Sequence, residues 1–207
     1  MKHLRLLLPI AFPLLLLGLF FTALQTKASP SATFTVNSTV DAVDADPGDG
    51  VCETAVANQC TLRAAVMEAN VLSGEDTINL PNGTFVLTLI GADEDLATTG
   101  DLDITEDLNI LGNEMSTTIV DGNYNDRIFH IHVGLVTISD ITIQNGVNTN
   151  SSGTGGGGIF VDRDGGINLN TVTIANNQST GLGTFASVSG GGIFSRGMVT
   201  ITNSIIN

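Results

Sequence analysis

Positive charge is scarce in this sequence of 207 residues, which has 7 lysines and arginines against 21 acidic residues and no lysine after Lys27. Such a surface repels nucleic acid and anionic membranes, and it offers no basic patch for phosphate. It also repels acidic polysaccharides such as pectin unless a cation bridges the two surfaces. The composition therefore excludes nucleic acid as a partner.

Cysteine is also rare, because Cys52 and Cys60 are the only two in the chain and they do not form a CxxC pair. Their spacing and the lack of a nearby histidine argue against a redox or metal-binding pair. In an oxidising compartment such cysteines form a disulfide, which stabilises a loop this short by roughly 2–3 kcal/mol. We therefore predict a Cys52–Cys60 bridge.

Residues 1–28 contain the one long apolar run, Leu6–Leu24, preceded by Lys2 and Arg5 and followed by small residues up to Ala28. This pattern indicates a secretory signal peptide cleaved after Ala28. An uncleaved membrane anchor is the alternative, because the run is just long enough to span a bilayer. Cleavage removes three positive charges and no acid, so the net charge falls from −14 to −17. It leaves no membrane span and predicts a secreted or cell-surface protein.

The stretch from Leu135 to Asn207 repeats one pattern of short β-branched segments and glycine-rich corners. Aligning Ile138, Leu169 and Ile201 gives steps of 31 and 32 residues. The same alignment superposes a second apolar set, which consists of Ile143, Ile174 and Ile206. A fixed period filled with strands too short for a sandwich marks a solenoid. We predict an all-β fold, a three-sided parallel β-helix of fewer than five coils.

The corners of this repeat carry asparagine and glycine. Asn145 and Asn176 share a register, which predicts an asparagine ladder at one corner. The glycine run Gly155–Gly158 permits positive φ and close backbone approach. It is not a phosphate-binding loop, because neither a lysine nor a helix follows it.

One helix is expected before the coils, beginning after Thr61 as N-cap and free of glycine until Gly74. Its small apolar face has helical spacing and consists of Leu62, Ala65, Val66 and Ala69. An open β-helix exposes strand edges at its end, and an amphipathic helix laid across that end covers them. The expected organisation is a signal peptide (1–28), a cap with acidic loop, disulfide and helix (29–76), and coils (77–207).

The segment Cys60–Asn70 reads Cys-Thr-Leu-Arg-Ala-Ala-Val-Met-Glu-Ala-Asn and resembles the Cys-Ser-Leu-Arg-Glu-Ala motif that opens many exported bacterial β-helix proteins. Ala64 stands where that motif has glutamate, and Gly100–Ile104 is also similar to this group. The Gly-Gly-Gly-Ile-Phe copies are similar to repeats of polymorphic outer-membrane proteins and related adhesins. The resemblance covers residues 34–207. It implies a right-handed, pectin-lyase-like parallel β-helix displayed outside the cell, without implying an activity.

Two acidic loops are candidates for a cation site. Asp44, Asp46 and Asp49 lie in a loop with proline and glycine, and this density of oxygen atoms is typical of a Ca²⁺ loop. The third aspartate comes one place late for an EF-hand, and Ala55 stands where the closing glutamate is needed. A Ca²⁺ site and an ordinary acidic turn both remain open here. The loop Asp93–Asp95 is a second candidate of the same kind.

His130 and His132 alternate with Phe129, Ile131 and Val133, so the histidines share one strand face and the apolar residues the other. Two histidines on one face can ligate a metal if a neighbouring coil supplies a third ligand. The sequence favours the simpler interpretation of two solvated histidines opposite a buried face.

Asp162 and Asp164 flank Arg163 just after a repeat strand and are the weak catalytic candidates. In an extended strand their carboxylates lie about 6–7 Å apart, near the separation in inverting glycoside hydrolases. The arginine keeps both carboxylates charged, whereas an acid catalyst needs a raised pKa. A polar turn is the alternative, and the next copy has Ser195 and Gly197 around Arg196 instead of acids.

Two functions follow from these patterns. The first is an exported, non-enzymatic, adhesin-like surface protein that binds glycans or host and cell-surface components. The alternative is a polysaccharide lyase or glycoside hydrolase, which requires acids and a basic residue converging on one lateral groove. The sequence ends on the apolar segment Val199–Asn207. Because solenoids need a closing repeat, we expect a fragment truncated from a longer chain.

Overall fold

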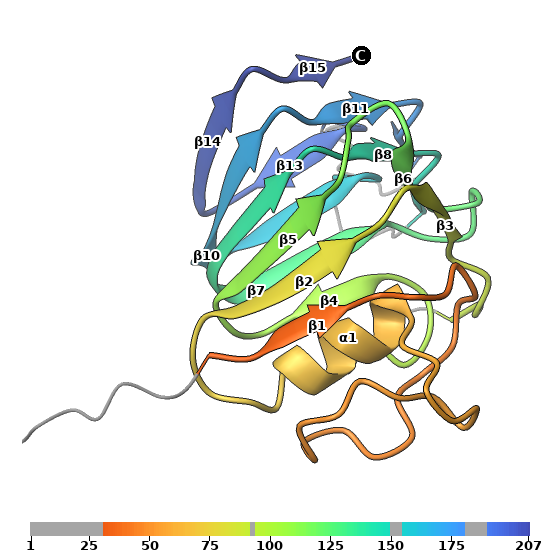
Figure 1. The fold of residues 1–207 in the computed structure, drawn as a ribbon. Coiled ribbons are helices and arrows are strands. Elements are labelled where there is room, and N and C mark those ends of the chain that lie inside the picture. Colours follow the sequence, from red (N-terminus) through yellow and green to blue (C-terminus); the bar gives the residue numbers. More distant parts are fainter. Residues whose placement is uncertain (1–30, 92–93, 150–154, 181–189) are drawn as a thin grey trace, which may run out of the picture.

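The protein is a parallel β-helix of about four turns in a computed structural model that describes residues 31–91, 94–149, 155–180 and 190–207 (Figure 1). The strand pairs of these residues are parallel, which confirms the predicted fold class. Within these ranges no helix is long and apolar enough to cross a membrane. The expected signal peptide lies outside the described residues.

The strands form two main sheets and a short third one. The first sheet contains β1 (Thr33–Thr35), β2 (Asp76–Leu80), β4 (Leu102–Ile104), β5 (Leu108–Gly112), β7 (Phe129–Ser139), β10 (Ile159–Asn170), β13 (Ile193–Ser195) and β14 (Met198–Thr202). The second contains β3 (Gly83–Val86), β6 (Thr118–Asp121), β8 (Thr142–Gln144), β11 (Thr173–Ala175) and β15 (Ile205–Ile206). The third pairs β9 (Val147–Asn148) with β12 (Gln178–Ser179).

The first sheet covers two faces of the coil, because β7 and β10 bend in the middle. The first halves of these strands pair with β4 and β13, and their second halves pair with β5 and β14. Gly134 makes the bend in β7 with a φ of 89°. The bend explains why Val133 is exposed, contrary to expectation, while Phe129 and Ile131 are fully buried as expected.

Apolar side chains stack in register inside the coil. Ile138 pairs with Leu169, and Leu169 pairs with Ile201, as predicted from the repeat. The second predicted set is also confirmed, with Ile174 paired to Ile143 on one side and to Ile206 on the other. Ile138, Leu169, Ile143 and Ile174 are buried and each contributes roughly 1.5–3 kcal/mol to the core. Ile201 and Ile206 continue the two ladders at the last coil, where they are 43% and 48% exposed.

The corners take the backbone through left-handed conformations. Asn145 and Asn176 have φ values of 61° and 55°, which asparagine tolerates better than most residues. Asn145 donates its side-chain amide to Asp121 of the preceding coil at 2.8 Å. In the glycine run, a Cβ atom at Gly157 would collide with backbone oxygens, one of them from Gly146. Close backbone approach therefore explains the glycine run.

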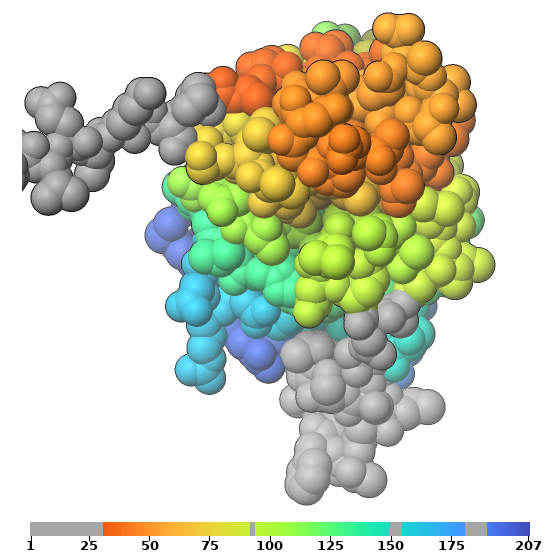
Figure 2. Space-filling view, turned by 90° about the horizontal axis from the view of Figure 1, so that it is seen from below, coloured from red at the N-terminus to blue at the C-terminus, as the bar shows by residue number. Residues whose placement is uncertain are grey.

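The N-terminal cap contains α1 (Leu62–Ala69), and the side chain of Thr61 accepts the N–H of Ala64 as the predicted N-cap. The disulfide between Cys52 and Cys60 is confirmed, with an S–S distance of 1.98 Å. The red and orange residues of the cap gather in one continuous mass in Figure 2, which shows the molecule from below. This segment lies at the end of the coil where β1 begins the first sheet.

The helix differs from the amphipathic helix expected, because all of its residues are buried. Arg63 donates from Nε to Asp41 Oδ1 at 2.6 Å, and its two Nη atoms donate to the carbonyl oxygens of Ala97 and Gly100 at 2.8 Å. Asp41 in turn accepts the N–H of Leu89. The arginine thus ties the cap loop to the first coil from inside the protein.

Glu68 is the second buried charge of the helix, and its carboxylate accepts the N–H groups of Gly48 and Gly50. The polar face of α1 therefore packs against the acidic loop that contains Gly48 and Gly50 and is not exposed to solvent. Sequence periodicity shows which residues of a helix are polar, but it does not reveal that an irregular loop will cover them.

Candidate functional site

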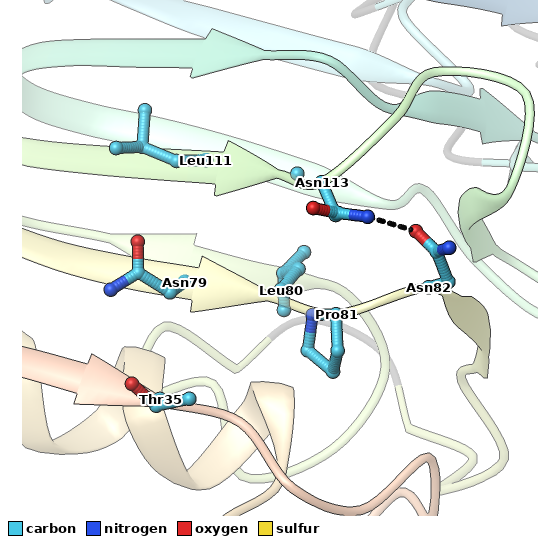
Figure 3. A pocket seen from close by; sticks show the side chains of 8 residues that line it. Thr35, Asn79, Leu80, Pro81, Asn82, Leu111 and Asn113 are labelled. Carbon is cyan, nitrogen blue, oxygen red and sulfur yellow. Dashed lines mark hydrogen bonds between the residues drawn. The ribbon is translucent and has the colours of Figure 1, made fainter.

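A neutral groove of about 570 Å³ lies between the first coils, beside the corner between β2 and β3 (Figure 3). Its lining contains Thr35, Asn79, Leu80, Pro81, Asn82, Leu111, Gly112 and Asn113. Asn113 donates its side-chain amide to Asn82 Oδ1 at 2.8 Å. The groove offers amide and hydroxyl groups for hydrogen bonding, and none of its lining residues is ionisable.

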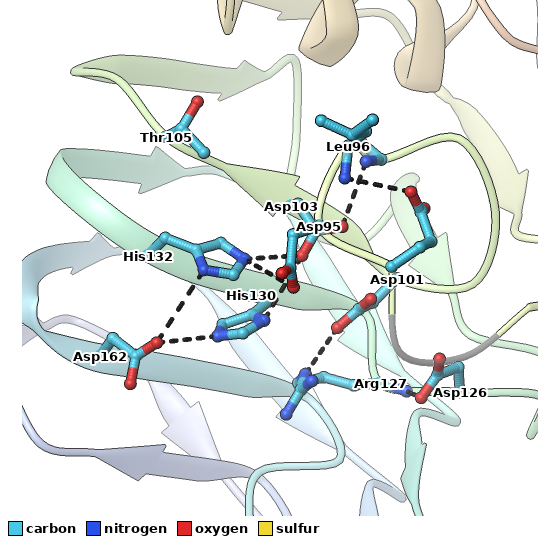
Figure 4. A network of polar contacts seen from close by, with 12 residues as sticks. Asp95, Leu96, Asp101, Asp103, Thr105, Asp126, Arg127, His130, His132 and Asp162 are labelled. Atoms are coloured by element: carbon cyan, nitrogen blue, oxygen red, sulfur yellow. Dashed lines mark hydrogen bonds and ion pairs between the residues drawn. The ribbon is translucent and has the colours of Figure 1, made fainter.

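A second cluster, which we call the polar wall, lies on and beside the outer face of β4, β7 and β10 and consists of Asp95, Asp101, Asp103, Asp126, Arg127, His130, His132 and Asp162 (Figure 4). Parallel register stacks one side chain per coil here: Asp103 pairs with His130, His130 with Phe160, and Phe160 with Phe194. The rings of His130 and Phe160 stack with centroids 4.8 Å apart. Residues distant in sequence therefore meet on one rigid surface.

The rings of the two histidines lie side by side on β7, with centroids 3.6 Å apart. Asp103 Oδ1 lies 2.8 Å from Nε2 of His132 and 3.4 Å from Nδ1 of His130. Asp162 Oδ2 lies on the opposite side, 3.2 Å from Nε2 of His130. The side chains of His130 and His132 are only 12% and 23% exposed, so the expectation of two solvated histidines is wrong. The neighbouring coil places the carboxylate of Asp103 beside both imidazoles.

These contacts shift the pKa values of the wall. The hydrogen bond that His132 donates to Asp103 raises the pKa of His132, and burial of the ring opposes this effect. Burial alone would raise the pKa of Asp103, but its hydrogen bonds to both histidines lower it below the usual range. The two shifts therefore favour a charged Asp103 carboxylate next to a protonated His132.

Next to the histidines, Arg127 Nε pairs with Asp101 Oδ2 at 2.7 Å, and its guanidinium lies over the Phe160 ring. Burial raises the pKa of Asp101, although Arg127 opposes the shift. Burial and the charge of Asp101 raise the pKa of Asp126 to about 6. Carboxyl groups with raised pKa values can act as proton donors near neutral pH.

In the candidate Ca²⁺ loop, two of the three carboxylates accept hydrogen bonds from the backbone of the loop itself. Asp44 is buried and accepts the N–H groups of Asp46 and Glu53, and Asp49 accepts the N–H of Val51. The carboxylates of Asp44 and Asp49 thus accept backbone N–H groups and stabilise the turn. Among the described residues, the group of carboxylates and imidazoles close enough for one ion consists of Asp95, Asp103, His130 and His132. Asp95 belongs to the second acidic loop, which was a candidate for a cation site, whereas Asp93 lies outside the described residues.

The weak catalytic candidates are separated by a β-bulge, since the register of β10 against β7 shifts between Val161 and Asp164. The expected carboxylate separation assumed a regular extended strand, which this bulge interrupts. Asp162 turns toward the histidines and also pairs with Arg196 at 3.6 Å, while Asp164 is exposed. Only Asp162 therefore joins the polar wall.

Sequence reasoning missed Asp101, Asp103, Asp126 and Arg127. A signal for two of them exists in β4, where Leu102 and Ile104 are buried and alternate with the two aspartates. That alternation places Asp101 and Asp103 on the outer face. The alternation does not reveal that these aspartates lie beside the histidines, because that contact depends on the pairing of β4 with β7.

Comparison with known proteins gives no further guide to function. No protein-family model, curated protein or solved structure matches this chain. The groove and the polar wall are therefore the features that bear on function, since a fold of this kind does not by itself specify an activity.

Proposed function

We propose that this chain is an exported, non-enzymatic β-helix module that binds glycans or other cell-surface components. The neutral groove carries the proposal, because Asn79, Asn82 and Asn113 present amides beside Thr35 and no ionisable side chain lines it. Amides and hydroxyls match the donors and acceptors of sugar hydroxyl groups. They provide no acid, base or nucleophile, which suits binding without turnover.

Export is supported by the signal-like residues 1–28 and by the disulfide in the cap, since structural disulfides persist mainly in oxidising compartments. The resemblance of Cys60–Asn70 to the motif of exported bacterial β-helix proteins agrees with this location. We further propose that the protein is secreted or displayed at the cell surface.

A glycan array probed with the purified protein tests the binding proposal. Replacing Asn82 or Asn113 by alanine removes a hydrogen-bonding amide and should weaken binding about 2- to 10-fold. Gln178→Ala is the matched control, because Gln178 is exposed on β12 and does not line the groove. If the groove variants bound glycans as well as the control does, the groove would not be the binding surface and the proposal would fail.

A polysaccharide lyase or glycoside hydrolase is the second candidate, favoured by the convergence of acids and arginines on the polar wall. Asp126, with its pKa raised to about 6, would be the proton donor, and Arg127 would hold an acidic sugar. A glycan panel assayed for reducing ends or unsaturated products decides between the candidates. Turnover that disappears in Asp126→Asn or Asp162→Asn would replace the non-enzymatic proposal.

A further inference from the structure

Four atoms able to ligate a metal ion lie close together on the polar wall. One ligand atom each from Asp95, Asp103, His130 and His132 lies within 4.8 Å of the other three. A tetrahedral site with metal–ligand bonds of 2.0–2.2 Å separates its ligand atoms by about 3.4 Å. Asp103 Oδ1 lies 3.4 Å from His130 Nδ1 and 2.8 Å from His132 Nε2, which in turn lies 3.8 Å from Asp95 Oδ1. These separations bracket the tetrahedral value.

The surrounding contacts also match those of a metal site. A histidine ligand usually hydrogen-bonds a carboxylate through its other ring nitrogen, which fixes the orientation of the ring. With Nδ1 of His130 facing Asp103, its Nε2 lies 3.2 Å from Asp162 Oδ2. The Nδ1 atom of His132 lies 4.0 Å from the same oxygen. The bulge in β10 therefore places one carboxylate behind both imidazoles.

The side chain of Asp103 is also fixed in position. Its side chain is fully buried, and Oδ2 accepts the N–H of Ala97 at 3.1 Å, which leaves Oδ1 directed at the histidines. Phe160 stacks on His130 from the coil on the other side. A cluster whose side chains are positioned before an ion arrives needs little rearrangement to bind one.

We propose that Asp95, Asp103, His130 and His132 form a binding site for a divalent transition-metal ion of the Zn²⁺ type. Two imidazoles and two carboxylates suit this class, whereas Ca²⁺ and Mg²⁺ prefer sites made of oxygen ligands alone. Asp95 is 76% exposed and forms the solvent-facing side of the site. This assignment is independent of glycan binding in the neutral groove.

Titration of the intact, EDTA-treated protein with Zn²⁺ tests the site. We expect one Zn²⁺ per chain, unaffected by a large excess of Ca²⁺. His130 and His132 are the only histidines beyond His3, so their ring signals can be followed individually by NMR and both should shift on binding. Non-saturating binding, or unshifted ring signals, would overturn the assignment.

Variants distinguish Zn²⁺ binding at this site from non-specific attraction of Zn²⁺ to the acidic surface of the protein. Asp162→Asn should weaken Zn²⁺ binding about 10- to 100-fold, as loss of a supporting carboxylate does, and His132→Gln should weaken it more. The control replaces the exposed Asp46 by asparagine and should bind Zn²⁺ normally. Asp95→Asn changes an exposed side chain and tests the site if His132→Gln does not fold. Unchanged affinity in Asp95→Asn and Asp162→Asn would refute the proposal.

Discussion

Replacing Arg63 by alanine tests whether the buried arginine holds the cap onto the coils. The side chains of Arg63 and Asp41 are 0% and 2% exposed and lie 2.6 Å apart. Removing one partner of a buried ion pair typically costs 3–5 kcal/mol, because the other charge is left buried without compensation. The carbonyl oxygens of Ala97 and Gly100 also lose a donor, which adds roughly 1–3 kcal/mol each.

We therefore expect Arg63→Ala to lower the free energy of unfolding by about 5 kcal/mol or more. Because domains of this kind are stable by roughly 5–15 kcal/mol, the variant should be largely or wholly unfolded. Arg63→Lys keeps the charge but loses the planar set of donors, so about half of the loss should remain.

Urea unfolding followed by circular dichroism measures these effects. Arg163→Ala is the matched control, since Arg163 is exposed on β10 and its loss should change stability by no more than about 0.5 kcal/mol. A loss below about 1 kcal/mol for Arg63→Ala would refute the assigned role, because it would mean that the buried contacts of the guanidinium contribute little to stability.

Three further predictions concern the core, the wall and the cap. Ile174→Ala should cost about 2–4 kcal/mol in urea unfolding because Ile174 is fully buried, whereas Ile206→Ala, at a residue 48% exposed, should cost clearly less; equal losses would contradict the stacked core. The pKa of Asp126, raised to about 6 from 3.8, means that the folded state binds this proton more tightly than the unfolded state does. The free energy of unfolding should thus fall as the pH rises from about 4 to about 6. The loss should be about 1–2 kcal/mol once solvent screening of the half-buried carboxylate is included. Asp126→Asn should be more stable than the parent at pH 7 by this amount and lack this pH dependence, and an unchanged pH profile would argue against the shift. Reduction of the Cys52–Cys60 disulfide should lower the free energy of unfolding by roughly 2–3 kcal/mol, as measured with and without reductant; no change would show that the bridge adds nothing to the cap.

The coil stack was predictable because its signal is periodic. Ile138, Leu169 and Ile201 recur at nearly constant spacing, and parallel stacking requires just such a spacing. The N-cap at Thr61 and the disulfide were predictable for a similar reason, since each depends on residues close in sequence.

The polar wall was not predictable because it depends on spacings that vary. Asp103 and His130 are 27 residues apart, whereas Phe160 and Phe194 are 34 residues apart, although both are register pairs in the same sheet. Loops of different length between the strands absorb this variation. The bulge that turns Asp162 toward the histidines has no clear sequence signal either, so the wall follows only from the assembled coils.

Strand β7 alternates between core residues and wall residues, with Phe129 and Ile131 inside and His130 and His132 outside. Folding and ligand chemistry are therefore encoded by different residues of the same strand. A library randomised only at His130 and His132 should yield proteins that share one fold but differ in what they bind. Selection could thus give this solenoid new specificities without first having to rebuild its interior.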